Sequence, residues 1–313
     1  MKQSDRIYKL GEIDSNIPKG MFVVSFSQFS KWKKCPRAWK LAYIDKQKIS
    51  KPGINATFGT AMHRCIQKWV SVMLTETVKA SEEIIFENDL LATLREEYLK
   101  DVQKYGSHFS TREELAEFYS DGVSILNWLR KNRTRYFSTK TTQFVGCEIP
   151  VLHRVDPKKP VLLMCFLDLV TRDLSSKKFL IQDLKTSTRG WSKWDKGDEV
   201  KISQLRLYKK YFSEQYGIPI DDIEIEYLIL KRKIDENSEF PQRRVQQFQP
   251  ASGKVSINKT VREFTEFLDF CFSETGYNTE AHYHAIAGSK FSNCRFCEYN
   301  SEEYCPVKDR ICV

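Results

Sequence analysis

The chain has 313 residues, of which 50 are basic and 41 acidic, so that its net charge is +9. The hydrophobic content of 41% and the aromatic content of 13% exclude an intrinsically disordered chain and indicate a folded protein with a sizeable core. No apolar run has the length of a membrane span, and residues 1–20 lack the apolar segment of a secretory signal. We therefore expect a protein of the cytoplasm, or of a host cytoplasm if it is viral, with no membrane partner.

The first part of the chain has helical hydrophobic periodicity. Helices are predicted over residues 25–43, where Pro36 starts a second helix, and over residues 58–74, 82–104 and 111–132. The last of these opens with Thr111-x-x-Glu114, a capping-box pattern.

The pattern changes after residue 135. Predicted strands lie over residues 143–151, 161–170, 179–184, 223–231 and 244–248, and predicted helices over residues 199–216 and 255–272. This order predicts an α/β fold with a mixed central sheet flanked by helices. We divide the chain into a mostly helical part over residues 1–135, a core over residues 136–275 and a cysteine-rich tail over residues 276–313.

Acidic and basic side chains lie at the ends of two of the predicted strands. Asp183 and Lys185 end the strand over residues 179–184, and strand alternation points them the same way. Asp168 ends the preceding apolar run, and the polar turn over residues 172–178 would bring it beside that pair. Two carboxylates and an amine at one sheet edge can hold a divalent cation and position a water. The pattern therefore predicts metal-assisted phosphodiester cleavage, whereas an isolated Asp-x-Lys would indicate only a solvated strand end.

Two helices supply further candidates. His63 follows the turn over residues 58–60 and is interpreted as a metal ligand or a residue that orients one, the alternative being a partly buried helix histidine. Gln204 and Tyr208, at i and i+4, share one helix face, which by itself is also typical of an ordinary amphipathic helix.

In chain order these motifs resemble those of RecB-type nucleases of the PD-(D/E)XK superfamily. The matching segments are Gly59-Thr60-Ala61-Met62-His63, Phe166-Leu167-Asp168, Ile181-Gln182-Asp183-Leu184-Lys185-Thr186-Ser187 and Gln204-x-x-x-Tyr208. Leu167 stands where the proline that names the superfamily would lie. The resemblance implies a restriction-endonuclease-like core and a Mg²⁺- or Mn²⁺-dependent deoxyribonuclease, an exonuclease acting on single-stranded DNA or DNA ends.

The resemblance also implies roles for individual residues. Lys185 would orient or activate the attacking water, and Gln204 and Tyr208 would support the site and contact nucleic acid. Glu148, in an earlier strand, would match an acidic position of some relatives. The ligands of Mg²⁺ or Mn²⁺ would be His63, Asp168, Asp183 and the backbone carbonyl of Leu184.

Three cysteines near the end of the chain have metal-ligand spacing. Cys294-x-x-Cys297 followed by Cys305 can chelate one metal centre. The spacing leaves two candidates for a fourth ligand: Cys312, which would complete a local zinc site, and Cys35. The other cysteines fit buried thiols, as expected inside a cell: Cys65, Cys147, Cys165 and Cys271.

The resemblance favours Cys35 as that fourth ligand. Residues 25–37 look like the N-terminal motif of the iron–sulfur members, among them the AddB subunit of bacterial helicase–nucleases and the CRISPR-associated exonucleases. In these proteins one early and three late cysteines hold a [4Fe–4S] cluster. The resemblance thus implies a cluster on Cys35, Cys294, Cys297 and Cys305.

Basic and aromatic residues interleave in two segments, which suits single-stranded DNA. In residues 31–43 the rings could equally pack into the core. The second segment follows the predicted catalytic strand and supplies the expected contacts Arg189, Trp191, Lys193 and Trp194. No G-x-x-x-x-G-K-[ST] motif occurs, so a helicase or recombination partner would be a separate polypeptide. The alternative function is a non-catalytic nucleic-acid-binding adaptor or assembly subunit.

Overall fold

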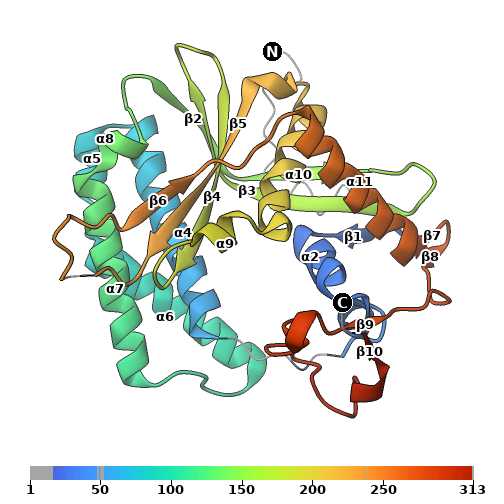
Figure 1. Cartoon of the computed structure of the whole chain (residues 1–313). Coiled ribbons are helices and arrows are strands. Elements are labelled where there is room, and N and C mark those ends of the chain that lie inside the picture. Colours follow the sequence, from blue (N-terminus) through green and yellow to red (C-terminus); the bar gives the residue numbers. More distant parts are fainter. Residues whose placement is uncertain (1–16, 48, 50–52, 236, 312–313) are drawn as a thin grey trace.

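A mixed sheet forms the centre of the computed structural model, which describes residues 17–47, 49, 53–235 and 237–311 (Figure 1). The strand order is β1-β3-β4-β5-β6, and β2 pairs with β3. The β1–β3 and β4–β5 pairs are parallel, and the other pairs are antiparallel. The predicted mixed α/β fold is therefore confirmed. The strands are β1 (Phe22–Val24), β2 (Thr142–His153), β3 (Val161–Asp173), β4 (Phe179–Ser187), β5 (Ile223–Lys231) and β6 (Val245–Phe248).

Helices cover both faces of the sheet. One face packs against α2 (Phe26–Lys34), α3 (Pro36–Tyr43), α10 (Glu199–Tyr216) and α11 (Lys254–Cys271). The other face packs against α4 (Ile54–Thr75) and α8 (Arg133–Tyr136), and α5 (Val78–Glu82), α6 (Phe86–Tyr105) and α7 (Arg112–Lys131) pack on α4. No described helix is long and apolar enough to cross a membrane.

Each face of the sheet has its own hydrophobic core. Trp39 and Phe267 are fully buried in the first, and Trp69 and Leu184 are fully buried in the second. Full burial of one such side chain contributes about 1.5–3 kcal/mol, so these two cores hold α4 and α10 firmly on opposite faces of β4. The two helices that carry the predicted site residues are thereby fixed relative to the strand between them.

Gly122 allows α7 to approach α4 closely. A Cβ atom built at this position would lie 2.6 Å from Leu90 Cδ2, 3.0 Å from Phe58 Cε2 and 3.1 Å from Met62 Sδ. These separations are shorter than ordinary van der Waals contacts, so a larger residue would require the Leu90 side chain to move and would press on Phe58 and Met62. The absence of a side chain at Gly122 thus leaves room for side chains of α4 and α6.

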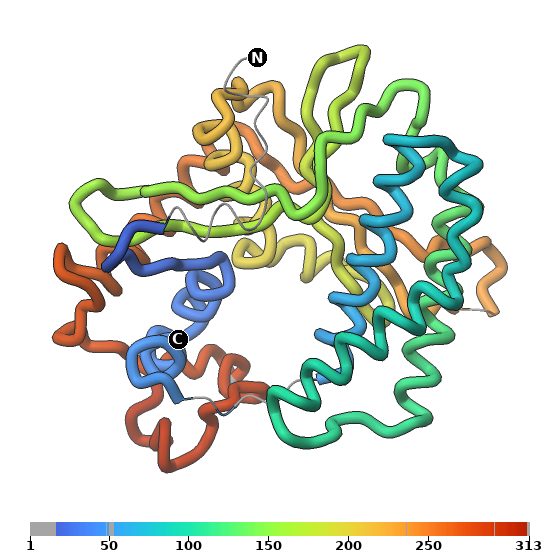
Figure 2. The backbone as a smooth tube through the Cα atoms, turned by 180° about the vertical axis from the view of Figure 1, so that it is seen from behind, coloured from blue at the N-terminus to red at the C-terminus, as the bar shows by residue number. Residues whose placement is uncertain are grey.

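The N-terminal helices and the C-terminal tail lie side by side in both views (Figures 1 and 2). The Arg37 guanidinium donates to the Tyr304 carbonyl at 3.1 and 3.2 Å, and Lys31 forms an ion pair with Glu298. Within the tail, β9 (Ala285–Ile286) pairs in parallel with β10 (Arg310–Ile311). Segments distant in sequence are thus joined beside α3.

The structure differs from the predicted elements at a few places. Strand β1 was not predicted, since three residues are too short for a periodic signal. The helix predicted over residues 82–104 begins only at Phe86, because α5 and a short break precede it. Half of the predicted capping box is present: the Thr111 hydroxyl accepts from the Glu114 N–H at 3.1 Å, but the Glu114 carboxylate accepts from the Ser110 hydroxyl instead.

Candidate active site

Strands β3 and β4 stop pairing at the predicted acidic residues. Their registered pairs run from Arg172–Phe179 to Leu169–Gln182. Beyond the last pair the Asp168 carboxylate accepts a hydrogen bond from the Leu184 N–H at 2.8 Å. The Asp168 side chain thus accepts the hydrogen bond that a backbone carbonyl of β3 would accept in a continued strand pair, and this bond holds Asp168 beside the backbone of β4.

Asp183 and Lys185 face the same side of β4. Lys185 Nζ lies 2.7 Å from Asp183 Oδ2, and Asp183 is only 2% exposed. This ammonium is in ion-pair contact with Asp183 Oδ2, and no other described group bonds to that oxygen. The Lys185 ammonium compensates part of the charge of this carboxylate, and the lone pairs that it leaves open can bind a metal cation as well. This atom is therefore a fitting ligand for a divalent ion.

The charges of the site perturb one another. Burial raises the pKa of Asp168, and repulsion by Asp183 raises it further, against the attraction of Lys185. Burial acts to lower the pKa of Lys185, but the attraction and close contact of Asp183 outweigh it and raise that pKa. Lys185 is therefore a cation at neutral pH, and the crowded carboxylates favour a further positive charge between them.

His63, on α4, also lies close to Asp168. Its Nδ1 atom lies 3.5 Å from Asp168 Oδ2. Burial lowers the pKa of His63 to about 4, although the nearby Asp183 charge opposes the shift. The imidazole is consequently neutral at physiological pH, which is the form that binds metal ions.

Sequence reasoning missed Gln67, which connects two acidic residues. The Gln67 side-chain amide donates to Glu148 Oε1 at 2.6 Å and to the Asp168 carbonyl at 2.9 Å. Gln67 follows His63 by four residues, so the i, i+4 rule for one helix face was the signal that could have found it. Glu148 itself has a φ of 51°, a left-handed conformation that is strained for a residue in a strand.

On α10, the Gln204 amide donates to the Tyr208 hydroxyl at 2.8 Å, so these residues share the predicted face. They meet His63 and Asp168 in a cleft of about 420 Å³, here called the catalytic cleft, whereas Lys185 lines a neighbouring cleft. Asp183 is almost completely buried and lines no part of it. Candidate and supporting residues that line the catalytic cleft are His63, Gln67, Glu148, Asp168, Gln204 and Tyr208.

The sequence model of the PD-(D/E)XK nuclease superfamily matches residues 23–306. The chain belongs to the PD-(D/E)XK nuclease superfamily. A search of curated proteins finds no match to the chain. Membership identifies the sheet and its flanking helices as a restriction-endonuclease-like fold, and it assigns the chain to nucleases, which act on DNA and generally use divalent metals.

The predicted nucleic-acid contacts of this nuclease lie outside the catalytic cleft. The Trp191 ring packs against Tyr227 at 4.8 Å between centroids, whereas Trp194 is 87% exposed. Lys193 is exposed as well, and Arg189 lines a separate cleft of about 670 Å³ together with Lys231.

In the first basic and aromatic segment the rings belong to the core. Trp32 and Trp39 pack against Phe267 at 5.5 and 5.7 Å between centroids. Lys33 pairs with Glu263, whereas Lys34 is exposed and has no ion-pair partner among the described residues. The core alternative holds for the two tryptophans, and Lys34 remains available to a ligand.

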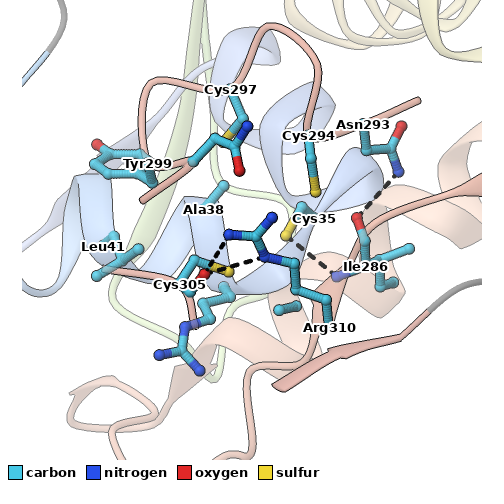
Figure 3. A pocket seen from close by; sticks show the side chains of 13 residues that line it. Cys35, Ala38, Leu41, Ile286, Asn293, Cys294, Cys297, Tyr299, Cys305 and Arg310 are labelled. Carbon is cyan, nitrogen blue, oxygen red and sulfur yellow. Dashed lines mark hydrogen bonds between the residues drawn. The ribbon is translucent and has the colours of Figure 1, made fainter. Parts of the chain in front are cut away.

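Four cysteines of the nuclease line one pocket (Figure 3). The Ile286 N–H donates to Cys35 Sγ at 3.4 Å, and burial raises the pKa of the Cys294 and Cys297 thiols. The Arg310 guanidinium also lines the pocket and donates to the Cys305 carbonyl at 3.0 Å. The other candidate, Cys312, lies outside the described residues.

Neither the carboxylate and histidine candidates nor the four cysteines are arranged as a finished metal site. In the described parts of the chain no group of three or more histidine, cysteine, aspartate or glutamate side chains could hold a metal ion as it stands. The donor chemistry nevertheless suits such groups, because oxygen and neutral imidazole ligands gather at one site and thiols at the other.

The other cysteines behave as core thiols. Cys165 and Cys271 are buried, and burial raises the pKa of the Cys65 and Cys147 thiols to about 12. Such thiols are protonated at neutral pH and are poor metal ligands.

Proposed function

We propose that this nuclease is a Mg²⁺- or Mn²⁺-dependent exonuclease that acts on single-stranded DNA or on DNA ends. One observation carries the proposal: the Asp183–Lys185 pair on β4, whose carboxylate is buried, lies close enough to repel the Asp168 carboxylate, which lines a cleft. Carboxylates that repel each other attract a cation, and an ammonium next to them can act on a phosphate or on a water.

The metal ligands in this proposal are Asp168, Asp183, His63 and the Leu184 carbonyl. A bound divalent ion supplies charge neutralisation at the scissile phosphate and a water of lowered pKa. Lys185 remains protonated, so its Nζ donates a hydrogen bond to the attacking water or to the oxygen on which negative charge develops.

Two further groups of residues contact DNA in the proposal. The hydrogen-bonded Gln204–Tyr208 pair lines the catalytic cleft and supports the site. Contacts to a single strand outside the cleft come from the loop with Arg189, Trp191, Lys193 and Trp194, of which Trp194 offers a free ring face. A helicase or recombination partner would bring its own motor, because the chain has no Walker A motif.

We also propose a [4Fe–4S] cluster on Cys35, Cys294, Cys297 and Cys305. Supporting it are the shared pocket, the N–H that points at Cys35 Sγ and the nearby Arg310 cation, which suits an anionic cluster. Zinc is the competing metal, and Cys312 is the competing ligand. Iron and acid-labile sulfide in protein purified without air, assayed for the parent and for the C35S and C312S variants, separate these possibilities.

The nuclease proposal is tested with Asp183→Asn, Lys185→Met and the matched control Lys178→Met. Lys178 lies just before β4 and pairs with Glu224 on the surface, far along the strand from the site. Asp183→Asn and Lys185→Met should lower cleavage of labelled DNA at least about 100-fold, while the control keeps the parental rate. Parental cleavage by the Asp183→Asn variant would overturn the assignment.

Substrates with blocked ends or with no ends distinguish exonuclease from endonuclease action. Single-stranded DNA with blocked 5′ or 3′ ends and circular single-stranded DNA are incubated with Mg²⁺ or Mn²⁺. An exonuclease leaves circles intact and stops at one blocked end. Cleavage of circles would contradict exonuclease action, and binding without any cleavage would support the adaptor alternative.

A further inference from the structure

We propose that the Cys294–Cys297 turn forms part of the substrate path, with Phe296 stacking on a base of a single strand that reaches Lys185 along α2. The inference rests on the proposed nuclease function and adds a subsite to it. Its occupant is single-stranded nucleic acid, because the bases of a duplex are already stacked on each other and cannot lie on a protein ring.

The turn itself presents the ring outward. The Cys297 N–H donates to the Cys294 carbonyl at 3.1 Å, which closes a four-residue turn with Arg295 and Phe296 at its centre. Phe296 is 88% exposed, and the Arg295 guanidinium lies 5.3 Å from the centroid of its ring. An aromatic face with a cation beside it is suited to a nucleobase and its phosphate.

A second cleft joins this ring to the catalytic lysine. It measures about 570 Å³ and is here called the α2–tail cleft, and both Lys185 and Phe296 belong to its lining. It shares Phe26, Ser27 and Gln204 with the catalytic cleft, so the two clefts adjoin. A strand lying in the α2–tail cleft would therefore lead directly to the proposed site of cleavage.

The lining of the α2–tail cleft matches a nucleic-acid backbone. Ser27 and Ser30 offer hydroxyls, and Lys34 offers an ammonium without an ion-pair partner among the described residues. Lys31 contributes less charge, since Glu298 pairs with it. Hydroxyls and ammonium groups bind phosphates, whereas exposed rings bind bases, and this cleft contains both kinds of group.

The subsite is tested by binding rather than by cleavage. Fluorescence anisotropy of a short labelled oligothymidylate is measured in EDTA for the full chain and its variants. Stacking of one base contributes about 1–3 kcal/mol, so Phe296→Ala should weaken binding at least about fivefold. Phe296→Trp should retain tight binding, and Phe240→Ala should equal the parent, because Phe240 is also exposed (76%) but lines neither cleft.

Two further variants distinguish the loss of the aromatic ring from a folding defect in the turn. Phe296→Leu keeps an apolar side chain but no ring and should bind as weakly as Phe296→Ala. Lys34→Gln lies outside the turn and should weaken binding and lower its salt dependence by about one phosphate contact. Parental affinity of Phe296→Ala, or an equal loss in Phe240→Ala, would overturn the inference.

Failure of this inference is distinguishable from failure of the proposed function. The parental protein is assayed separately with Mn²⁺ and bis(p-nitrophenyl) phosphate, a diester that has neither a nucleobase nor a sugar–phosphate chain. Hydrolysis together with ring-independent DNA binding would reject the subsite and keep the nuclease. No hydrolysis of this diester or of DNA, together with ring-dependent binding, would keep the subsite and reject the catalytic proposal.

Discussion

The Asp168 carboxylate accepts a hydrogen bond from the Leu184 N–H at 2.8 Å, at the point where β3 and β4 cease to pair. Asp168 Oδ2 thus accepts a hydrogen bond from the backbone of the strand that carries Asp183 and Lys185. No described group bonds to the other carboxylate oxygen, so that oxygen can bind an ion. Asp168 is therefore both a structural acceptor and a proposed metal ligand, and substitutions can separate these roles.

Asp168→Asn and Asp168→Ala should both lower cleavage about 100-fold or more, because each removes a ligand charge. Their stabilities should differ. The Asn variant keeps an acceptor for the Leu184 N–H and removes the repulsion by Asp183, so its free energy of unfolding should equal or exceed that of the parent without metal. The Ala variant leaves that N–H unsatisfied and should be about 1–3 kcal/mol less stable than the Asn variant. Urea unfolding in EDTA measures both, and equal stabilities would contradict the structural role.

Gln67→Met should raise the Mn²⁺ concentration needed for half-maximal cleavage by about tenfold, without abolishing cleavage. The amide that it removes holds Glu148 and the Asp168 carbonyl in place, and outer partners of metal ligands typically contribute this much. Gln143→Met, at an exposed glutamine of β2, is the matched control. An unchanged metal requirement in the Gln67 variant would show that it does not position the site.

Cys35→Ser should release the C-terminal tail from α3 when the proposed metal is lost. We expect loss of bound iron, faster proteolysis of residues 276–311 and a lower midpoint of thermal unfolding. Cys165→Ala is the control, since it leaves a cavity in the core but removes no proposed ligand. Destabilisation with retained metal is expected there, and iron loss in both variants would argue against the assigned ligand.

The pKa of Asp195 should lie near 2, because hydrogen bonds from Lys201 and from Ser192 stabilise its carboxylate. A depressed folded pKa stabilises the fold above the unfolded value of about 4, and that contribution disappears as the pH falls toward 2. Since Asp195 is 35% exposed, solvent screening limits the contribution at neutral pH to less than about 1 kcal/mol. Carboxyl titration by NMR should show Lys201→Gln raising this pKa toward 3.8, and no rise would refute the assigned cause.

Much of the fold could be predicted because its signals are local. The helix predicted over residues 199–216 coincides with α10, whose Asp198 side chain caps the first turn and whose Gly217 ends the last with a φ of 65°. The strand around Asp183 was recognisable from an apolar run that ends in charges, and alternation was enough to place Lys185 on the same side.

The remainder depends on tertiary contacts that no local pattern contains. Strand β1 exists only because Phe22 pairs with Val161 across the sheet. The link from Gln67 to Glu148 joins a helix to a strand 81 residues away. Trp191 lies in a basic and aromatic segment, and the packing of its ring on Tyr227 could be seen only in the folded sheet.

The tight packing around Gly122 involves a residue next to the candidate active site. Met62, which would meet a new methyl group there, immediately precedes His63 on α4. Alanine at position 122 would displace the Leu90 side chain and press on Phe58 and Met62, so the packing of α4 next to His63 would have to adjust. A genetic screen for inactive nuclease alleles would accordingly recover this inconspicuous glycine along with the acidic residues.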